Sequence, residues 1–195
     1  MAYDEKYAPC LQLTYARHAE YCKKWNIDYH VRIGQVPRYE NDAWAKIALI
    51  QEQLWWHDYV IWLDADTIIR DFETDIRRAF VSPINGVRWE HPLSHVQAGI
   101  LFFRSDSLPL VDYMMNERKY YIKRFPGLRG WYEQGQLNEM AEDPHFKIHI
   151  AAIDDKWNWS ELYMPPCLDV VIEAWHGESF DQFWPKMIAR MAEIG

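Results

Sequence analysis

The run Val60-Ile61-Trp62-Leu63-Asp64-Ala65-Asp66-Thr67 joins four apolar residues to two carboxylates that stand two positions apart. The apolar part is typical of a strand buried on both faces. Because a core does not hold two unpaired acids, we expect Asp64 and Asp66 at the exposed carboxyl end of that strand, where open α/β sheets bind ligands. Side chains two residues apart share one face of an extended strand, so the pair predicts a site for Mg²⁺ or Mn²⁺.

Helices and strands are expected to alternate before this run. Helical spacing extends over Tyr7–Trp25, and Ile27–Ile33 alternates as a strand does. A second amphipathic helix is expected to begin at Asn41 or Asp42, both good N-caps, and to lead into the acidic strand. This order is typical of a parallel sheet covered by helices. A first strand before Tyr3 would be short or missing.

The same alternation continues after the acids. Further strands are expected near 86–89, over 97–103 and over 148–153, and further helices over 108–121, over 133–140 and from Ser179 or Asp181 onward. Two glycines and a proline in Phe125–Gly130 indicate a loop before one of these helices. The fold class predicted from these patterns is α/β, with a mixed, mainly parallel sheet flanked by helices.

Size and composition limit what the chain can be. With 195 residues it is long enough for one large core, so we expect a single domain over residues 1–195. A net charge of -8 argues against nucleic acid as the main partner, because phosphate backbones require a basic surface. No stretch approaches the roughly 20 apolar residues of a membrane span.

The N-terminus and the cysteines indicate a compartment. Met1–Lys6 lacks both the apolar centre of a signal peptide and the Arg-rich face of a transit peptide, so a cytoplasmic location is expected. Cys10, Cys22 and Cys167 are an odd number without a C-x-x-C pair, which indicates reduced, buried thiols rather than a disulfide framework or a zinc site.

Five motifs together carry a resemblance that covers nearly the whole chain. The motifs are Trp44-Ala45-Lys46-Ile47, Asp64-Ala65-Asp66-Thr67, Gln97-Ala98-Gly99, Glu133-Gln134-Gly135 and Trp175-His176-Gly177. Their order resembles that of metal-dependent GT-A glycosyltransferases, most of all the retaining galactosyl-, mannosyl- and xylosyltransferase group (family 34-type), with glycogenin-like (family 8-type) enzymes as neighbours. The implied fold is the Rossmann-like GT-A fold.

The resemblance implies a metal site. Asp64 and Asp66 would bind Mn²⁺, which would bridge the diphosphate of a nucleotide sugar, with Ala65 between them at the donor. His176 would complete the metal site, with Gly177 beside the donor. Imidazole suits Mn²⁺ better than Mg²⁺. From the residues alone, His176 could also be a surface histidine in a turn before Gly177.

The resemblance also implies donor contacts. Lys46 would contact the donor, although a lysine on an amphipathic helix can also be simply solvated. Tyr3 and Asp4 would hold the base and ribose, and Gln97 with Gly99 would touch the donor sugar. Gln97 stands where many relatives have asparagine, so the amide is kept but is one methylene longer.

Glu133 and Gln134 are the implied catalytic residues, standing where relatives have Asp-Gln. One of them would lie beneath the anomeric carbon, as a nucleophile or as a polar stabiliser. The expected reaction moves a sugar from a nucleoside diphosphate donor, a UDP-sugar, to a hydroxyl of a glycan or glycoconjugate acceptor, with retention. For an inverting enzyme, Glu133, Asp154 and Asp155 are the candidate bases.

Several alternatives remain open. Leu63-Asp64-Ala65-Asp66-Thr67 also fits a haloacid-dehalogenase-type phosphatase, in which Asp64 would be the nucleophile and Asp66 an acid/base. A non-catalytic carbohydrate-binding domain with a structural Ca²⁺ would account for the 11 Trp and 12 Tyr. Lys156-Trp157-Asn158 could line the acceptor side or be an ordinary turn. His91 and His95 are expected to be polar loop residues.

Overall fold

The structure is a computed structural model that describes residues 5–34, 42–89, 95–124, 132–162, 164–175 and 179–194. Within these ranges helices alternate with the strands of two sheets, and the α/β class predicted from the sequence is confirmed. The predictions made for Tyr3, Asp4, His176 and Gly177 lie outside the described residues. No described helix is both long and apolar enough to cross a bilayer.

The chain is divided into two compact units by its own contacts. One unit consists of Met1–Gln35, Leu63–Arg78 and Asp155–Gly195, and the other of Val36–Trp62 and Ala79–Asp154. We call the first the outer unit and the second the sheet unit. The prediction of a single domain stays a prediction.

The sheet unit contains a four-stranded sheet in the order β1-β4-β3-β5. Its strands are β1 (Tyr59–Leu63), β3 (Ile84–Trp89), β4 (His95–Arg104) and β5 (Ile150–Ile153). β3 pairs antiparallel with β4, with Ile84 opposite Phe103, and parallel with β5, with Ile84 opposite Ile150. The sheet is therefore mixed.

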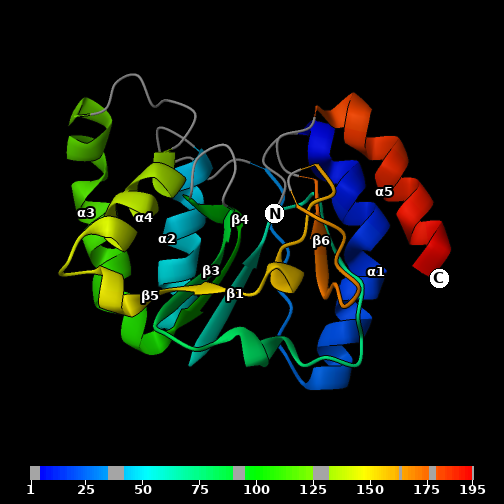
Figure 1. Cartoon of the computed structure of the whole chain (residues 1–195), viewed down its shortest axis with the longest axis horizontal. Coiled ribbons are helices and arrows are strands. Elements are labelled where there is room, and N and C mark those ends of the chain that lie inside the picture. The colour runs from blue at the N-terminus through cyan, green and yellow to red at the C-terminus, as the bar shows by residue number, and fades with distance from the viewer. Residues whose placement is uncertain are drawn as a thin grey trace. The chain divides into compact units, whose positions relative to one another are not determined.

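Three helices of the sheet unit pack together beside this sheet (Figure 1). They are α2 (Asp42–Leu54), α3 (Leu108–Arg124) and α4 (Tyr132–Glu142). Both α2 and α4 contact β4. All residues of β4 but its last are buried, which explains why it appears in the sequence as a nearly continuous apolar run. At Gly86 of β3, a Cβ would lie 2.6 Å from Val96 Cγ1, so the close approach of the two strands requires glycine.

The outer unit contains a two-stranded antiparallel sheet of β2 (Thr67–Ile69) and β6 (Ile172–Ala174). Trp159 extends it by a parallel bridge to Glu173. Helices α1 (Ala8–Trp25) and α5 (Phe180–Ile194) contact each other, and α1 contacts β2 (Figure 1). The core between these elements is formed by Cys10, Leu11, Ala65, Ile68, Trp175, Phe183 and Met187.

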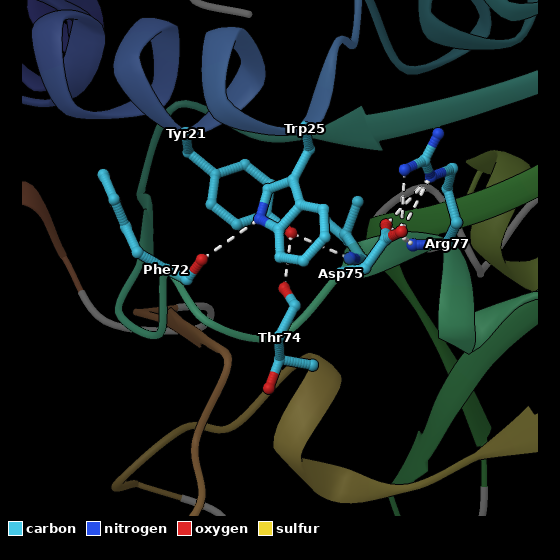
Figure 2. Close-up of polar contacts among 7 residues, drawn as sticks. Tyr21, Trp25, Phe72, Thr74, Asp75 and Arg77 are labelled. Atoms are coloured by element: carbon cyan, nitrogen blue, oxygen red, sulfur yellow. Dashed lines mark hydrogen bonds and ion pairs between the residues drawn. The ribbon is translucent and has the colours of Figure 1, made fainter.

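Side chains of α1 hold the segment that follows β2 (Figure 2). The Tyr21 hydroxyl donates to the Thr74 carbonyl at 2.7 Å and accepts from the Ile76 N–H at 2.7 Å, while Trp25 Nε1 donates to the Phe72 carbonyl at 3.1 Å. Backbone groups that have no ladder partner are thereby satisfied. The remaining elements are one-turn 3₁₀ helices at Glu5–Tyr7, Ile76–Ala79, Ser105–Ser107, Lys147–His149 and Asp155–Trp157.

The expected helices all form, but one expected strand does not. Ile27–Ile33 has no ladder and contains only one bridge residue, Ile33, so the prediction of a strand there is wrong. The predicted alternation is visible in the half-burial of Ile27 and Tyr29 between exposed neighbours, yet residues 31–33 are all exposed. Alternation describes a half-buried face, whereas a strand also needs a neighbouring strand to bond with.

The cysteines are free thiols, as predicted. Cys10 and Cys22 are buried, and burial raises the pKa of Cys22 to about 11. Cys167 is only half-buried, so the expectation of a buried thiol is wrong at that position. It lies close to Asp169, with Sγ 3.4 Å from Oδ1.

Candidate functional site

The two acids lie directly after β1, where the sequence predicted them. β1 ends at Leu63 and β2 begins at Thr67, so Asp64-Ala65-Asp66 forms the turn between them. The Thr67 hydroxyl donates to the Asp64 carbonyl at 2.7 Å and closes this turn. The backbone therefore does not stay extended, and the argument that an extended strand would put both carboxylates on one face is wrong here. We call these three residues the acidic turn.

Both acids of the acidic turn are half-buried, while Ala65 between them is packed into the core of the outer unit. The ladder between β2 and β6 continues one step into the turn, since the Trp175 N–H donates to the Asp66 carbonyl at 3.1 Å. Burial, together with the negative charge of Asp66, raises the pKa of the Cys10 thiol to about 12. The acidic turn is thus anchored by the end of β6 and lies close to the start of α1.

The donor chemistry of the acidic turn fits a hard divalent cation, because Mg²⁺ and Mn²⁺ bind carboxylate oxygens and retain waters or phosphate oxygens. His176, the third predicted ligand, directly follows Trp175 in sequence but lies outside the described residues. Among the residues that the structure describes, no three His, Cys, Asp or Glu side chains come together as a metal site. The metal site remains a prediction that rests on the two carboxylates.

A second group of candidate residues lies in the sheet unit, around the start of β4. Lys46 of α2 is buried, and its Nζ donates to the Ala98 carbonyl at 2.8 Å and pairs with Glu133 Oε1 at 3.2 Å. The same ammonium lies 5.6 Å from the centre of the Trp62 ring. The alternative of a solvated lysine is therefore wrong. A buried charge requires such partners, and Glu133 is equally buried.

Gln134 contacts β4, and Gln97 is part of this strand. Gln134 Oε1 accepts from the Ala98 N–H at 3.0 Å. Gln97 lies within β4, where its amide nitrogen is 2.5 Å from His95 Nε2, and both side chains are buried. The expectation that His95 is a loop residue is wrong, because it is the first residue of β4. Gly99, also predicted at the donor, follows on the same buried strand.

The structure thus collects the predicted residues in two groups. Asp64, Ala65 and Asp66 lie in the outer unit, and Lys46, Gln97, Gly99, Glu133 and Gln134 lie in the sheet unit. Sequence reasoning missed Asn138, which binds the peptide of Val96. Its position four residues after Gln134, on the same face of a predicted helix, was the available signal.

The remaining candidates lie at the C-terminal end of β5. Asp154 and Asp155 are exposed, and Lys156 pairs with Asp169 at 3.3 Å. Trp157 and Asn158 are buried, in and directly after a one-turn 3₁₀ helix. The acceptor-lining role of Lys156-Trp157-Asn158 stays a prediction.

Comparisons with known proteins reveal similarity at the level of structure alone. No protein-family model and no curated protein matches the sequence. The fold is similar to that of a glycosyltransferase involved in the glycosylation of the major capsid of PBCV-1, with a TM-score of 0.73 and 16% identity over 96% of each chain. It is also similar to the apo form of the glycosyltransferase GlyE of Streptococcus pneumoniae TIGR4, with a TM-score of 0.60 and 13% identity.

The extent of these likenesses differs. The alignment with GlyE covers 99% of this chain but 60% of that one. A second GlyE structure is matched over 77% of this chain and 44% of its own length, with a TM-score of 0.50 and 15% identity. At such identities the likeness shows the fold. The chain therefore has the mixed α/β fold of these glycosyltransferase structures, and over nearly its whole length that of the first one.

Proposed function

We propose that this chain is a metal-dependent glycosyltransferase that moves a sugar from a UDP-sugar to a hydroxyl of a glycan, with retention at the anomeric carbon. The observation that carries the proposal is the acidic turn at the end of β1, in a fold similar along 96% of its length to that of a glycosyltransferase. Open α/β sheets bind ligands at such strand ends.

The acidic turn would hold the metal in this proposal. Asp64 and Asp66 present hard oxygen ligands, and with His176 they would hold Mn²⁺ or Mg²⁺ against the diphosphate. The bound metal would supply Lewis-acid stabilisation of the charge that develops on the leaving diphosphate. Both acids are half-buried rather than enclosed in the core.

The residues around β4 would serve the sugar. Glu133 and Gln134 would stabilise the positive charge that develops at the anomeric carbon, with Glu133 kept as a buried carboxylate by the Lys46 ammonium at 3.2 Å. Gln97 would hold a sugar hydroxyl through its amide. Because Lys46 already donates to Ala98 and pairs with Glu133, its role in this proposal is to organise the acid rather than to bind phosphate.

The direct test is release of UDP with Mn²⁺ present. The purified chain is incubated with UDP-galactose, UDP-glucose, UDP-xylose and GDP-mannose, and nucleoside diphosphate is quantified with and without EDTA. We expect metal-dependent release from a UDP-sugar, lowered at least about 100-fold in the Asp64→Asn, Asp66→Asn double variant because both metal ligands lose their charge. Asp58→Asn, an exposed acid directly before β1, is the matched control and should retain activity.

Three further measurements separate the alternatives. Phosphate release from a phosphomonoester, without UDP release, would replace the transferase by a phosphatase with Asp64 as nucleophile. Sugar binding that persists in the double variant would instead support a binding domain. The anomeric coupling constant of the product, read by proton NMR, decides between retention and inversion.

Binding provides a readout that does not need the acceptor. UDP with Mn²⁺ should raise the thermal midpoint of the wild type, because a ligand that binds only the folded state stabilises it by mass action. The same mixture should leave the midpoint of the Asp64→Asn, Asp66→Asn variant unchanged. An equal shift in both proteins would mean that the acidic turn does not hold the nucleotide.

A further inference from the structure

The start of β4 lies beyond the end of its neighbour β1. β4 has 10 residues and β1 has 5. The Ser105 N–H donates to the Asp58 carbonyl at 2.8 Å, so β1 begins beside the end of β4 and runs back along it. After five residues β1 ends, and within the described part of the chain no other strand is paired with the first residues of β4 on that side. Backbone groups at such an open edge need other partners.

Three side chains supply these partners, two from α4 and one from α2. The Asn138 amide accepts from the Val96 N–H at 2.6 Å and donates to the Val96 carbonyl at 3.1 Å. Gln134 accepts from the Ala98 N–H at 3.0 Å, and Lys46 donates to the Ala98 carbonyl at 2.8 Å. We call these three side chains the β4 bracket. Together they satisfy four backbone groups at the start of β4, namely the N–H and the carbonyl of Val96 and of Ala98.

The spacing within the bracket matches the two backbones. Gln134 and Asn138 stand four residues apart on α4, which corresponds to a rise of about 6 Å along a helix. Val96 and Ala98 stand two residues apart on β4, which corresponds to about 6.6 Å along a strand. Asn138 also donates to the Gln134 carbonyl at 2.7 Å, so the two α4 residues of the bracket are hydrogen-bonded to each other. The bracket therefore fixes the position of α4 along β4.

A shift of α4 would move the proposed catalytic residues. Glu133 directly precedes Gln134, and it reaches Lys46 at 3.2 Å only while α4 stays at this height. Gln97 lies between the two bracketed peptides of β4. A displacement of about 1 Å in a reacting geometry can cost a hundredfold in rate.

We propose that Asn138 is a positioning residue, which sets the height of α4 along β4 and thereby places Glu133 and Gln134 against Gln97 for sugar transfer. This inference rests on the proposed function. Asn138 touches neither donor nor acceptor in this role, so its loss acts on turnover and not on donor affinity.

The test compares Asn138→Ala and Asn138→Asp with the wild type. Asn138→Asp keeps an acceptor for the Val96 N–H but loses the N–H groups that donate to the Val96 and Gln134 carbonyls. Its kcat should therefore lie between those of the wild type and Asn138→Ala. We expect kcat to fall about 10- to 100-fold in Asn138→Ala, with the donor KM within about threefold. Asn116→Ala removes an exposed asparagine from α3 and should change neither constant by more than about twofold.

Amide hydrogen exchange at Val96 and Ala98 provides a second readout that does not need activity. Both amides should exchange at least tenfold faster in Asn138→Ala, whereas only Ala98 should do so in Asn138→Asp. Faster exchange with an unchanged kcat would overturn the proposal, because α4 would then be placed by packing alone. A raised KM with unchanged kcat would overturn it too, because Asn138 would then act in binding.

The two proposals fail separately. A wild-type chain that transfers no sugar from any of the nucleotide sugars contradicts the proposed function, and the bracket is then judged by exchange. Unchanged exchange at Val96 and Ala98 in Asn138→Ala overturns the bracket whether or not the wild type is active.

Discussion

His18 lies in surroundings that differ strongly from those of a solvated side chain. It is buried in α1, its Nε2 accepts from the Ile69 N–H at 3.2 Å, and the Tyr29 hydroxyl lies 3.4 Å from Nδ1. Burial lowers the pKa of His18 to about 3, from an ordinary value near 6.5. The neutral ring is therefore part of the folded structure, since a charged imidazolium could not accept the Ile69 N–H.

This burial makes the stability of the protein depend on pH. Between about pH 6.5 and pH 3 the unfolded chain binds a proton at His18 that the folded chain does not bind. The free energy of unfolding should therefore fall as the pH is lowered through this window, by up to about 1.4 kcal/mol per pH unit from His18. Urea unfolding at pH 4, 5, 6 and 7 measures it.

The control for this prediction is His18→Gln, whose amide oxygen can still accept the Ile69 N–H but does not titrate. Its pH profile should be flatter than that of the wild type. Substitution of His30, an exposed histidine, should leave the slope unchanged. Parallel profiles for the wild type and His18→Gln would contradict the prediction.

Among the elements, β6 and α5 are joined by a buried charge. Glu173 of β6 is buried, and its Oε2 lies 2.9 Å from Arg190 Nε of α5 and 3.4 Å from Arg70 Nη1. Burial raises the pKa of Glu173, while the two arginines oppose this change. The carboxylate therefore depends on its partners to compensate for lost solvation.

Removal of one partner should destabilise the outer unit. Arg190→Met keeps most of the apolar stem but leaves Glu173 with Arg70 alone, so we expect a loss of about 1–3 kcal/mol in the free energy of unfolding. Adding Glu173→Gln should restore part of this loss, because the unpaired buried charge is then gone. Chemical denaturation of the single and double variants measures the coupling. Additive losses would contradict a dependence of Glu173 on Arg190.

At the scale of the whole molecule, the two units share one chain that passes between them four times. These passages separate the five segments that end at Gln35, Trp62, Arg78, Asp154 and Gly195. Unfolding of either unit therefore releases both ends of a segment that belongs to the other. We expect one cooperative transition for both units, as in a single domain.

Two probes measure this cooperativity. Far-UV circular dichroism reports on the helices of both units, and hydrogen exchange resolves the peptides of each. Phe183→Ala truncates the core of the outer unit, and such truncations cost about 3–5 kcal/mol. If the units unfold together, this variant should lower the unfolding midpoint of both units by a similar amount. A lower midpoint confined to the outer unit would show that the units unfold separately and would contradict the single-domain prediction.

Local patterns predicted much of this molecule because their causes are local. The helices α1, α2 and α3 follow from apolar spacing, and β1 and β4 follow from apolar runs that only burial explains. The acids after β1 were located for the same reason, since a core excludes unpaired charges. The buried pair of Lys46 with Glu133 was not predicted, because a lysine on a helix looks the same in sequence whether it is solvated or paired.

Pairing between distant segments could not be derived in this way. β2 and β6 are three residues each, too short for a pattern, and they exist because Thr67 meets Ala174 across more than a hundred residues. Ile27–Ile33 has the pattern of a strand and no ladder. The contact of Asn138 with the Val96 N–H exists only because α4 packs against β4, which is distant from it in sequence. Side-chain periodicity records which face is buried, whereas backbone hydrogen bonds depend on which segment arrives beside it, and the tertiary structure alone decides that.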